Sequence, residues 1–293
     1  MLTSVKTLLS SVVDYAGLFP QALLGIREAM ANYARYQIAC HGWMLGRFVL
    51  PASRLNEFEE LLPTFLLGKT RQWSLSVILS GDLELEIERV RSLNGGDKLT
   101  VTALEFPPLL PTEIERVFPR LPAGVDSFFE IPRLGDLEVY LAALRRTGAS
   151  AKIRTGGTTA DAFPSMTQLC QCIFSFAKAQ VPFKATAGLH HPLPANHRLT
   201  SAPDSPSTVM HGFLNVAVLA AFVYWQKVKP EEALEILDES SIDGFQFKAD
   251  SICWKDRRLN ISELEAARQS FFRSFGSCSF QEPVNDLKHL KLL

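Results

Sequence analysis

The sequence predicts a single (β/α)8 barrel of the TIM type that spans residues 1–293 and ends in a C-terminal helix. Eight short strand-like runs alternate with helical segments, and 293 residues is a length typical of one such barrel. The strands are apolar on the side that would face the surrounding helices, as a closed parallel sheet requires. No internal repeat, low-complexity segment or linker divides the chain. One domain is therefore expected.

Composition narrows the classes of function. Hydrophobic residues make up 47% of the chain, which is enough for a large core, and the net charge of −1 provides no basic field for nucleic acid or acidic membranes. Five cysteines without framework spacing favour reduced thiols in the cytoplasm. No signal peptide or membrane span is expected, because the longest apolar segment, Phe213–Trp225, is short and contains Asn215. We expect a cytoplasmic protein with a small-molecule partner and no nucleic acid, membrane or cofactor, and a homo-oligomer is compatible with the sequence.

Four strand signals in the first half of the chain each end at a turn or a proline and are followed by a helical pattern. The β-branched run SVVDYAG closes at Gly17, and RFVL closes at Pro51. Between the strands, apolar residues recur every three or four positions, as in helices with one buried face. The expected strands are part of Val5–Gly17, Arg47–Leu50, Ser74–Leu79 and Leu99–Phe106, and the expected helices are Ile26–Ala39, Arg54–Leu67, Leu83–Leu93 and Thr112–Phe118.

The second half supplies four more strand signals. The expected strands are Asp126–Ile131, two lysine-bearing runs within 150–157 and 181–188, and Gly244–Trp254, and the expected helices are Leu137–Arg146, Met166–Gln180, Phe213–Lys227 and Ile261–Phe275. The run CWKDRRLN that follows the eighth strand indicates a hairpin. Asn260 or Ser262 would cap the last helix, and its three phenylalanines would pack in the core.

The candidate site lies at the carboxyl ends of the strands, because barrels of this type place their active sites there. Side chains alternate between the two faces of a strand, so Lys152 and Arg154 point one way, and Lys184 and Thr186 do the same on the next strand. A buried cation must be paired or neutralised. Together these ends predict a charged pocket; its candidate residues are Asp14, Tyr15, Glu105, Glu130, Lys152, Arg154, Lys184, Thr186 and Lys248.

A long proline-rich loop after the second lysine strand, Leu189–Met210, adds histidines to this pocket. It contains His190, His191 and His197, and His211 follows at once. Histidines so placed could serve as acid–base groups or metal ligands, or simply cap the next helix. Because no HxH or HxxxH spacing occurs, we expect no metal and assign His190 and His191 to substrate binding.

The two lysines suggest a specific chemistry. On neighbouring parallel strands, which lie about 4.8 Å apart, inward residues at equal height are close neighbours. A lysine attacks a carbonyl only when it is unprotonated, and burial or a second cation favours that form. One lysine would form a Schiff base and the other would assist it, while Glu105, Glu130 or Asp14 would move protons.

Two motifs carry a family resemblance. AKIRTGG (151–157) is similar to the K-x-S-T-G strand of deoxyribose-phosphate aldolase, and VPFKATAGLHH (181–191) resembles the F-K-x-A-G-G strand of that family. The resemblance covers about 45 residues and implies a class I aldolase barrel. It also implies that Lys152 is the Schiff-base lysine and that Lys184 is the partner that lowers its pKa.

Three functions remain open from the sequence. The first is a lyase of the aldolase type that forms a lysine Schiff base with a small carbonyl substrate. The second is a metal-assisted or acid–base barrel enzyme that uses Glu105, Glu130 and the loop with His190 and His191. The third is a barrel without catalytic activity that binds a small anionic metabolite, in which the lysines pair with the glutamates for structural reasons.

Overall fold

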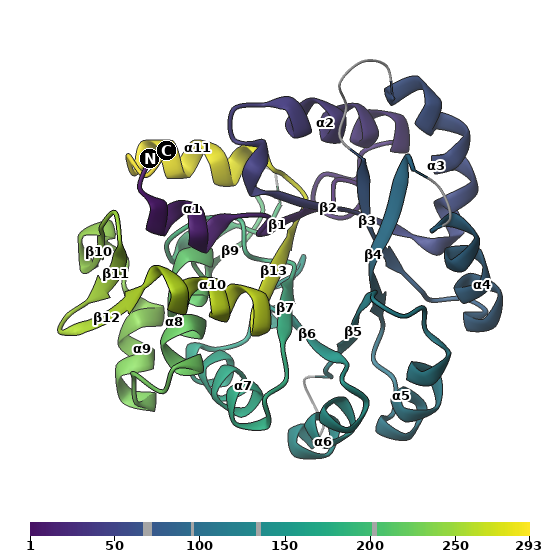
Figure 1. The fold of residues 1–293 in the computed structure, drawn as a ribbon. Coiled ribbons are helices and arrows are strands. Elements are labelled where there is room, and N and C mark those ends of the chain that lie inside the picture. Colours follow the sequence, from purple (N-terminus) through teal and green to yellow (C-terminus); the bar gives the residue numbers. More distant parts are fainter. Residues whose placement is uncertain (67–71, 95–96, 133–135, 201–203) are drawn as a thin grey trace.

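The fold is a closed barrel of eight parallel strands, which confirms the predicted (β/α)8 architecture (Figure 1). The computed structural model describes residues 1–66, 72–94, 97–132, 136–200 and 204–293. Around the barrel the strands follow the order β1-β13-β7-β6-β5-β4-β3-β2. Their bounds are β1 Val13–Tyr15, β2 Leu45–Pro51, β3 Trp73–Ile78, β4 Leu99–Phe106, β5 Asp126–Glu130, β6 Ser150–Arg154, β7 Phe183–Thr186 and β13 Phe272–Ser277.

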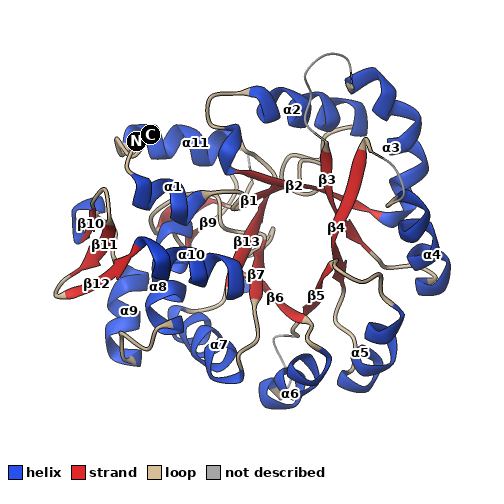
Figure 2. Ribbon diagram, in the orientation of Figure 1, coloured by secondary structure: helices blue, strands red, loops and turns tan. Residues whose placement is uncertain are grey.

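Helices surround the barrel on the outside, as the alternating pattern predicts (Figure 2). Their bounds are α1 Thr3–Leu9, α2 Ile26–Ile38, α3 Leu55–Leu61, α4 Leu83–Leu93, α5 Pro111–Val117, α6 Leu137–Thr147, α7 Met166–Ala179, α8 Phe213–Tyr224, α9 Pro230–Asp238, α10 Ile261–Ser270 and α11 Gln281–His289. Side-chain caps explain where several of them begin: Asp82 accepts from the backbone at the start of α4, and Ser165 forms a capping box with Gln168 on α7. The expected end of the second helix, Leu67, falls outside the described residues.

The prediction of the eighth strand is wrong. Gly244–Trp254 does not enter the barrel; β10 (Phe245–Phe247) and β11 (Ser251–Trp254) form an antiparallel sheet outside it with β12 (Arg257–Asn260). The predicted hairpin is confirmed as the β11–β12 pair. The eighth barrel strand is instead β13, which lies in the segment expected to continue the last helix. That helix, α10, begins at the predicted cap Asn260 but ends at Ser270.

Aromatic spacing caused this error. Phe271, Phe272 and Phe275 suit one face of a helix, yet they are equally compatible with a strand that is apolar on its outer side. In the structure Phe272 and Phe275 lie in β13, where Phe275 stacks on Phe213 of α8. All three phenylalanines are buried, so their predicted role in the core is confirmed.

Helix α8 is buried on every side, as its uniformly apolar sequence predicts. All residues from Phe213 to Val223 are buried. Strand β13 lies on one side of the helix, while α9, α10 and α7 pack around it. The extra helix α9, together with α7, α10 and β13, therefore explains a helix without a polar face. Among the described residues, none of the helices is both long and apolar enough to cross a membrane.

Candidate functional site

The register of the barrel brings the two lysines side by side. Lys152 on β6 is the Cα partner of Lys184 on β7, and Glu130 on β5 is the partner of Lys152. The three side chains therefore sit at one height on three neighbouring strands. The prediction that the lysines are close neighbours inside the barrel is confirmed.

Lys184 is fully buried between two carboxylates. Its Nζ donates to Oδ2 of Asp14 and to Oε1 of Glu105, each at 2.6 Å. Burial alone would lower the pKa of Lys184, but the charges of Asp14 and Glu105 outweigh it and raise that pKa. Lys184 is consequently a fixed ammonium at neutral pH.

The two carboxylates that hold Lys184 are themselves held by serines from two further strands. Ser76 of β3 donates to Oε1 of Glu105 at 2.7 Å, and Ser274 of β13 donates to Oδ2 of Asp14 at 2.6 Å. Burial opposes ionisation of both acids, yet Lys184 and Lys152 lower the pKa of Glu105 to about 2, and Lys184 and Arg47 lower that of Asp14. Both acids are therefore ionised inside the barrel.

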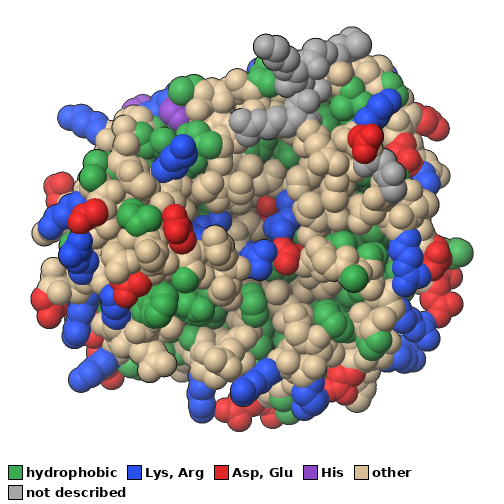
Figure 3. All heavy atoms as spheres, viewed as in Figure 1, with side chains coloured by type: hydrophobic (Ala, Val, Ile, Leu, Met, Phe, Trp, Pro, Cys, Tyr) green, Lys and Arg blue, Asp and Glu red, His purple; other side chains and the backbone are tan. Residues whose placement is uncertain are grey.

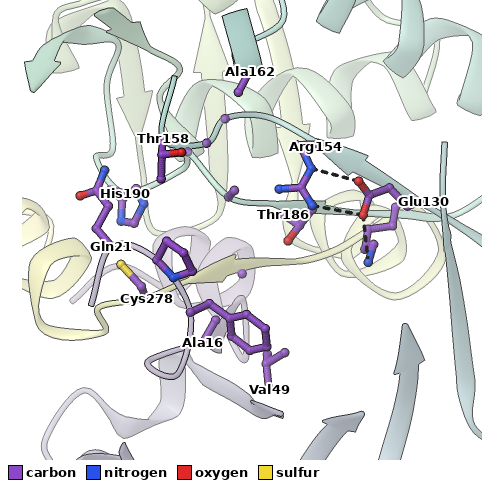
Figure 4. Close-up of a pocket in the computed structure, with 18 of the residues that line it drawn as sticks. Ala16, Gln21, Val49, Glu130, Arg154, Thr158, Ala162, Thr186, His190 and Cys278 are labelled. Atoms are coloured by element: carbon purple, nitrogen blue, oxygen red, sulfur yellow. Dashed lines mark hydrogen bonds and ion pairs between the residues drawn. The ribbon is translucent and has the colours of Figure 1, made fainter. Parts of the chain in front are cut away.

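Lys152 occupies a different environment although it is also buried. Its Nζ lies 3.2 Å from Oε2 of Glu130 and 3.5 Å from Oε2 of Glu105. Glu130 is shared with Arg154, whose Nε donates to Oε1 at 3.0 Å and whose side chain is 44% exposed (Figure 4). Glu105 therefore touches both lysines through its two oxygens, while Glu130 joins Lys152 to the solvent-facing Arg154.

A cavity of about 550 Å³ opens above Lys152 at the carboxyl ends of the strands. Its polar lining includes Glu105, Glu130, Lys152, Arg154, Lys184, Thr186 and His190, and its apolar lining includes Phe19, Val49, Ile78, Phe163 and Met210 (Figure 4). Such a volume with a few converging charges suits a small polar ligand. We call it the upper cavity.

Two glycines shape one wall of the upper cavity. A Cβ added to Gly156 would lie 2.6 Å from Cα of Gly188, and Gly188 has a φ of +75°. The loops after β6 and β7 therefore approach each other backbone to backbone, which a side chain at either position would prevent. The glycines that close both lysine strands are thus required by the packing of the two loops.

Four of the predicted site residues do not line the upper cavity: Lys248, Tyr15, Asp14 and His191. Lys248 lies just before β11 in the outer sheet, and this displacement follows from the misplaced eighth strand. Tyr15 points outward into an aromatic cluster with Tyr33, Tyr36 and Phe48, where burial raises its pKa to about 12. Asp14 does not line the upper cavity, and its link to the site is the hydrogen bond that it accepts from Nζ of Lys184.

The histidine loop packs against the C-terminal helix. Its described part includes an antiparallel pair, β8 (Ala195–Arg198) with β9 (Ser207–Met210). His191 Nδ1 lies 2.7 Å from Oδ2 of Asp286 on α11, and its ring stacks on His197. His190 lines the upper cavity, with its Nδ1 3.3 Å from Oε2 of Glu282. His191 is therefore part of a structural contact, and His190 is the loop histidine that faces the cavity.

His211 makes a structural contact as well. Its Nε2 donates to the carbonyl oxygen of Pro164 at 2.7 Å, and the residue is buried. Throughout the described ranges, no three His, Cys, Asp or Glu side chains form a group that could hold a metal ion. The geometry of the loop therefore offers no specific support for the metal-assisted alternative.

Several residues of the site were not foreseen from the sequence. Ser76 lies in SLSVIL, where the alternation of serine with apolar residues was a usable signal for an inward hydroxyl. Ser274 had no such signal once its segment was assigned to a helix. Cys278, Gln21 and Thr158 also line the upper cavity, and they come from loops for which periodicity gives no prediction.

The fold and the site together define a (β/α)8-barrel protein with a buried lysine–carboxylate network beneath its carboxyl-end cavity. No protein-family model matches the chain, and no curated protein matches it. Among solved structures, the chain is similar to the crystal structure of an uncharacterized metal-dependent hydrolase from Pyrococcus furiosus, with 17% sequence identity and a TM-score of 0.36. The match covers 72% of this chain and 53% of the other, so this chain spans about half of that protein's length. A similarity this weak bears on neither chemistry nor ligand.

Proposed function

We propose that the protein is a lyase of the class I aldolase type, in which Lys152 forms a Schiff base with a small carbonyl substrate. The observation that carries this proposal is the contrast between the two aligned lysines. Both lysines line the upper cavity, but Lys184 donates to Asp14 and Glu105 at 2.6 Å each, whereas Nζ of Lys152 lies 3.2 Å and 3.5 Å from its nearest carboxylate oxygens and is the less tightly held of the two. A carbonyl carbon that enters the upper cavity can reach this less tightly held amine, and the resemblance to class I aldolases assigns it the role of nucleophile.

Glu130 is placed to move the protons of this reaction, since its Oε2 lies 3.2 Å from Nζ of Lys152. It would accept a proton from the lysine, and the free amine would then attack the carbonyl carbon. Proton transfer to the oxygen of the resulting carbinolamine releases water and leaves an iminium. The substrate's β-hydroxyl then loses its proton to a base, the bond between the α and β carbons breaks, the β-carbon fragment leaves as an aldehyde or ketone, and the electron pair turns the iminium into an enamine. Protonation of the enamine and hydrolysis by one water then regenerate Lys152.

Arg154 supports a substrate that carries an acidic group. Its guanidinium is partly exposed at the wall of the upper cavity and uses Nε and one terminal nitrogen on Glu130. The remaining donors can bind a carboxylate or phosphate in the forked geometry that guanidinium favours. We therefore expect a small aldehyde, ketone or 2-oxo acid with one anionic end.

A binder without catalytic activity is the second candidate, because the observed ion pairs agree with it too. Lys184 has the contacts of a structural cation, and Lys152 pairs with both Glu105 and Glu130. The two candidates differ in one respect: only the lyase requires a covalent bond between Nζ of Lys152 and the ligand.

Borohydride trapping tests this difference. Purified protein would be incubated with small aldehydes, ketones and 2-oxo acids, reduced, and examined by intact mass and peptide mapping. We expect one stable adduct on Lys152 that is lost in Lys152→Ala and retained in Lys98→Ala, a control at an exposed lysine. Ligand-induced stabilisation without any adduct would favour the binder. An unchanged rate of carbon–carbon cleavage in Lys152→Ala would exclude Lys152 as the nucleophile.

A further inference from the structure

A second polar cavity lies at the opposite end of the barrel, where the strands begin. It is open to solvent, has a volume of about 770 Å³, and is lined by α1, α10 and the amino ends of β2, β3, β4 and β13. Figure 3 shows this face: basic and acidic side chains gather around the hollow at the centre of the barrel, beside α1 and α10. We call it the lower cavity. Barrels of this type do not use this end for catalysis, so its charges need another explanation.

Positive charge exceeds negative charge in the lower cavity. Its cationic residues are Lys6, Arg47, Arg268 and Arg273. Asp126 bridges Arg47 at 2.6 Å and Arg273 at 2.9 Å. Of the two acids in the lining, Asp14 is already bound to Lys184, and Glu265 is exposed. Neither Lys6 nor Arg268 pairs with a carboxylate of the residues that the structure describes.

Arg268 is the most unusual of these cations. Its guanidinium donates to the carbonyl oxygens of Phe272, Arg273 and Ser10, while its buried Nε has no hydrogen-bond partner among the described residues. Burial, followed by the neighbouring charge of Arg273, lowers the pKa of Arg268 to about 9. The group is still protonated at neutral pH. A partly buried guanidinium with no carboxylate partner is costly unless an anion completes it.

Hydroxyl groups complete the lining. Thr7, Ser10 and Ser11 come from α1 and the turn after it, and Ser74 and Thr102 form a hydrogen-bonded pair at 2.7 Å on β3 and β4. Serine and threonine hydroxyls donate readily to anionic oxygens, and arginine forks match the oxygens of phosphate. Lys6 and Arg268, which have no described carboxylate partner, and several hydroxyls around one open cavity are a chemistry that suits a multivalent oxyanion.

We propose that the lower cavity is a binding site for a phosphate group, either free phosphate or the phosphoryl end of a small metabolite. The site is separate from the upper cavity and does not depend on the function proposed for it. We assign it binding and no chemistry, because barrels of this type carry their active sites at the opposite end.

A matched pair of near-isosteric variants tests the site. Gln269 lines the lower cavity on α10 and is exposed, so Gln269→Glu adds one negative charge there with little change of shape. Gln171→Glu makes the same change on the outer face of α7, away from the cavity. Inorganic phosphate would be titrated by calorimetry at constant ionic strength, with chloride as the reference anion. We expect phosphate binding at least about tenfold weaker in Gln269→Glu, because the new carboxylate repels the phosphate and weakens its charged hydrogen bonds. Binding should be unchanged in Gln171→Glu.

A second set of variants keeps the proposal testable if one protein fails to fold. Arg268→Gln removes the uncompensated cation and is expected to weaken phosphate binding about tenfold or more. Lys6→Gln, at an exposed residue, is expected to weaken it about two- to threefold, with Arg116→Gln on the outer face of α5 as control. Tighter binding of glycerol phosphate than of inorganic phosphate would identify a metabolite, and the reverse would identify free phosphate. Phosphate binding no tighter than that of chloride, or binding undiminished in Gln269→Glu and Lys6→Gln, would overturn the proposal.

Discussion

The two ends of this barrel are both polar, but they balance charge differently. In the upper cavity each cation has a carboxylate: Lys184 and Lys152 share Glu105, and Lys152 and Arg154 share Glu130. In the lower cavity Arg268 and Lys6 pair with no described carboxylate. A network of matched charges fixes the positions of its members and leaves none of them without a partner. An excess of one sign instead leaves room for a ligand of the other sign.

Asp14 connects the two ends. Its Oδ2 accepts from Lys184 and Ser274, whereas its Oδ1 accepts from the backbone nitrogen of Arg47, which lines the lower cavity. The side chain of Arg47 approaches Asp14 to 3.7 Å. A continuous chain of charged groups therefore runs through the barrel, and Lys184 is its central member.

The largest effect is expected when Lys184 is removed. Lys184→Met would leave Asp14 and Glu105 buried without their cation, and breaking a buried pair in this way costs about 3–5 kcal/mol. Lys152→Met should cost clearly less, because Glu130 retains Arg154 and Glu105 retains Lys184. Urea unfolding of both variants measures the difference.

In any folded Lys184→Ala protein, the proposed lyase activity should be weaker and its pH optimum higher, since the neighbouring ammonium is gone. Equal stability losses for the two lysines would contradict the distinction between them.

Acid should destabilise the network next most strongly. The folded-state pKa of Glu105 is about 2, below its ordinary value of 4.5, so its contribution is present above pH 4.5 and is lost as the pH falls toward 2. A shift of this size corresponds to about 3 kcal/mol. Asp14, whose pKa is also lowered, acts in the same direction. Lys184, with a raised pKa, adds stability that is lost only in strong alkali, above its ordinary value of 10.5.

The acid effect is measured as the stability difference between wild type and Glu105→Gln from pH 6 to pH 2. That difference should shrink as the pH falls, because protonation makes the two side chains alike. Glu60→Gln, at an exposed residue of α3, serves as the control and should show little pH dependence. A difference that stays constant down to pH 2 would show that Glu105 does not carry the effect.

The upper site could be predicted from the sequence because strand parity and barrel topology act on neighbouring residues. Lys152, Lys184, Glu105 and Glu130 lie within strands that were recognised, so the alternation of side chains placed all four in the lumen. Lys248 was assigned to the site by the same reasoning from a strand that does not belong to the barrel. Side-chain alternation therefore places a residue correctly only where its strand belongs to the barrel.

The lower cavity could not be predicted because its cations come from unrelated segments. Arg268 lies in the last turn of α10, and Arg273 is the second residue of β13, whose register shifts between Phe272 and Phe275. Consistent with this shift, the adjacent residues Arg273 and Ser274 both contact acids of the lumen, Asp126 and Asp14. Strict alternation would send one of them outward. Only the folded chain shows that Arg268 and Arg273 line the same cavity as Arg47.

The smallest effect on stability is expected at the rim of the upper cavity. Arg154 is 44% exposed, and a pair in contact with solvent contributes at most about 1 kcal/mol, so Arg154→Gln should unfold almost like the wild type. The effect on substrate binding should be larger. KM for an anionic carbonyl substrate should rise several-fold while kcat changes less, because Arg154 binds the anionic end of the substrate and is not the nucleophile. A neutral aldehyde is the control and should show no rise in KM. A stability loss as large as that of Lys184→Met would place Arg154 within the structural network, and an unchanged KM for every anionic substrate would remove it from the binding site.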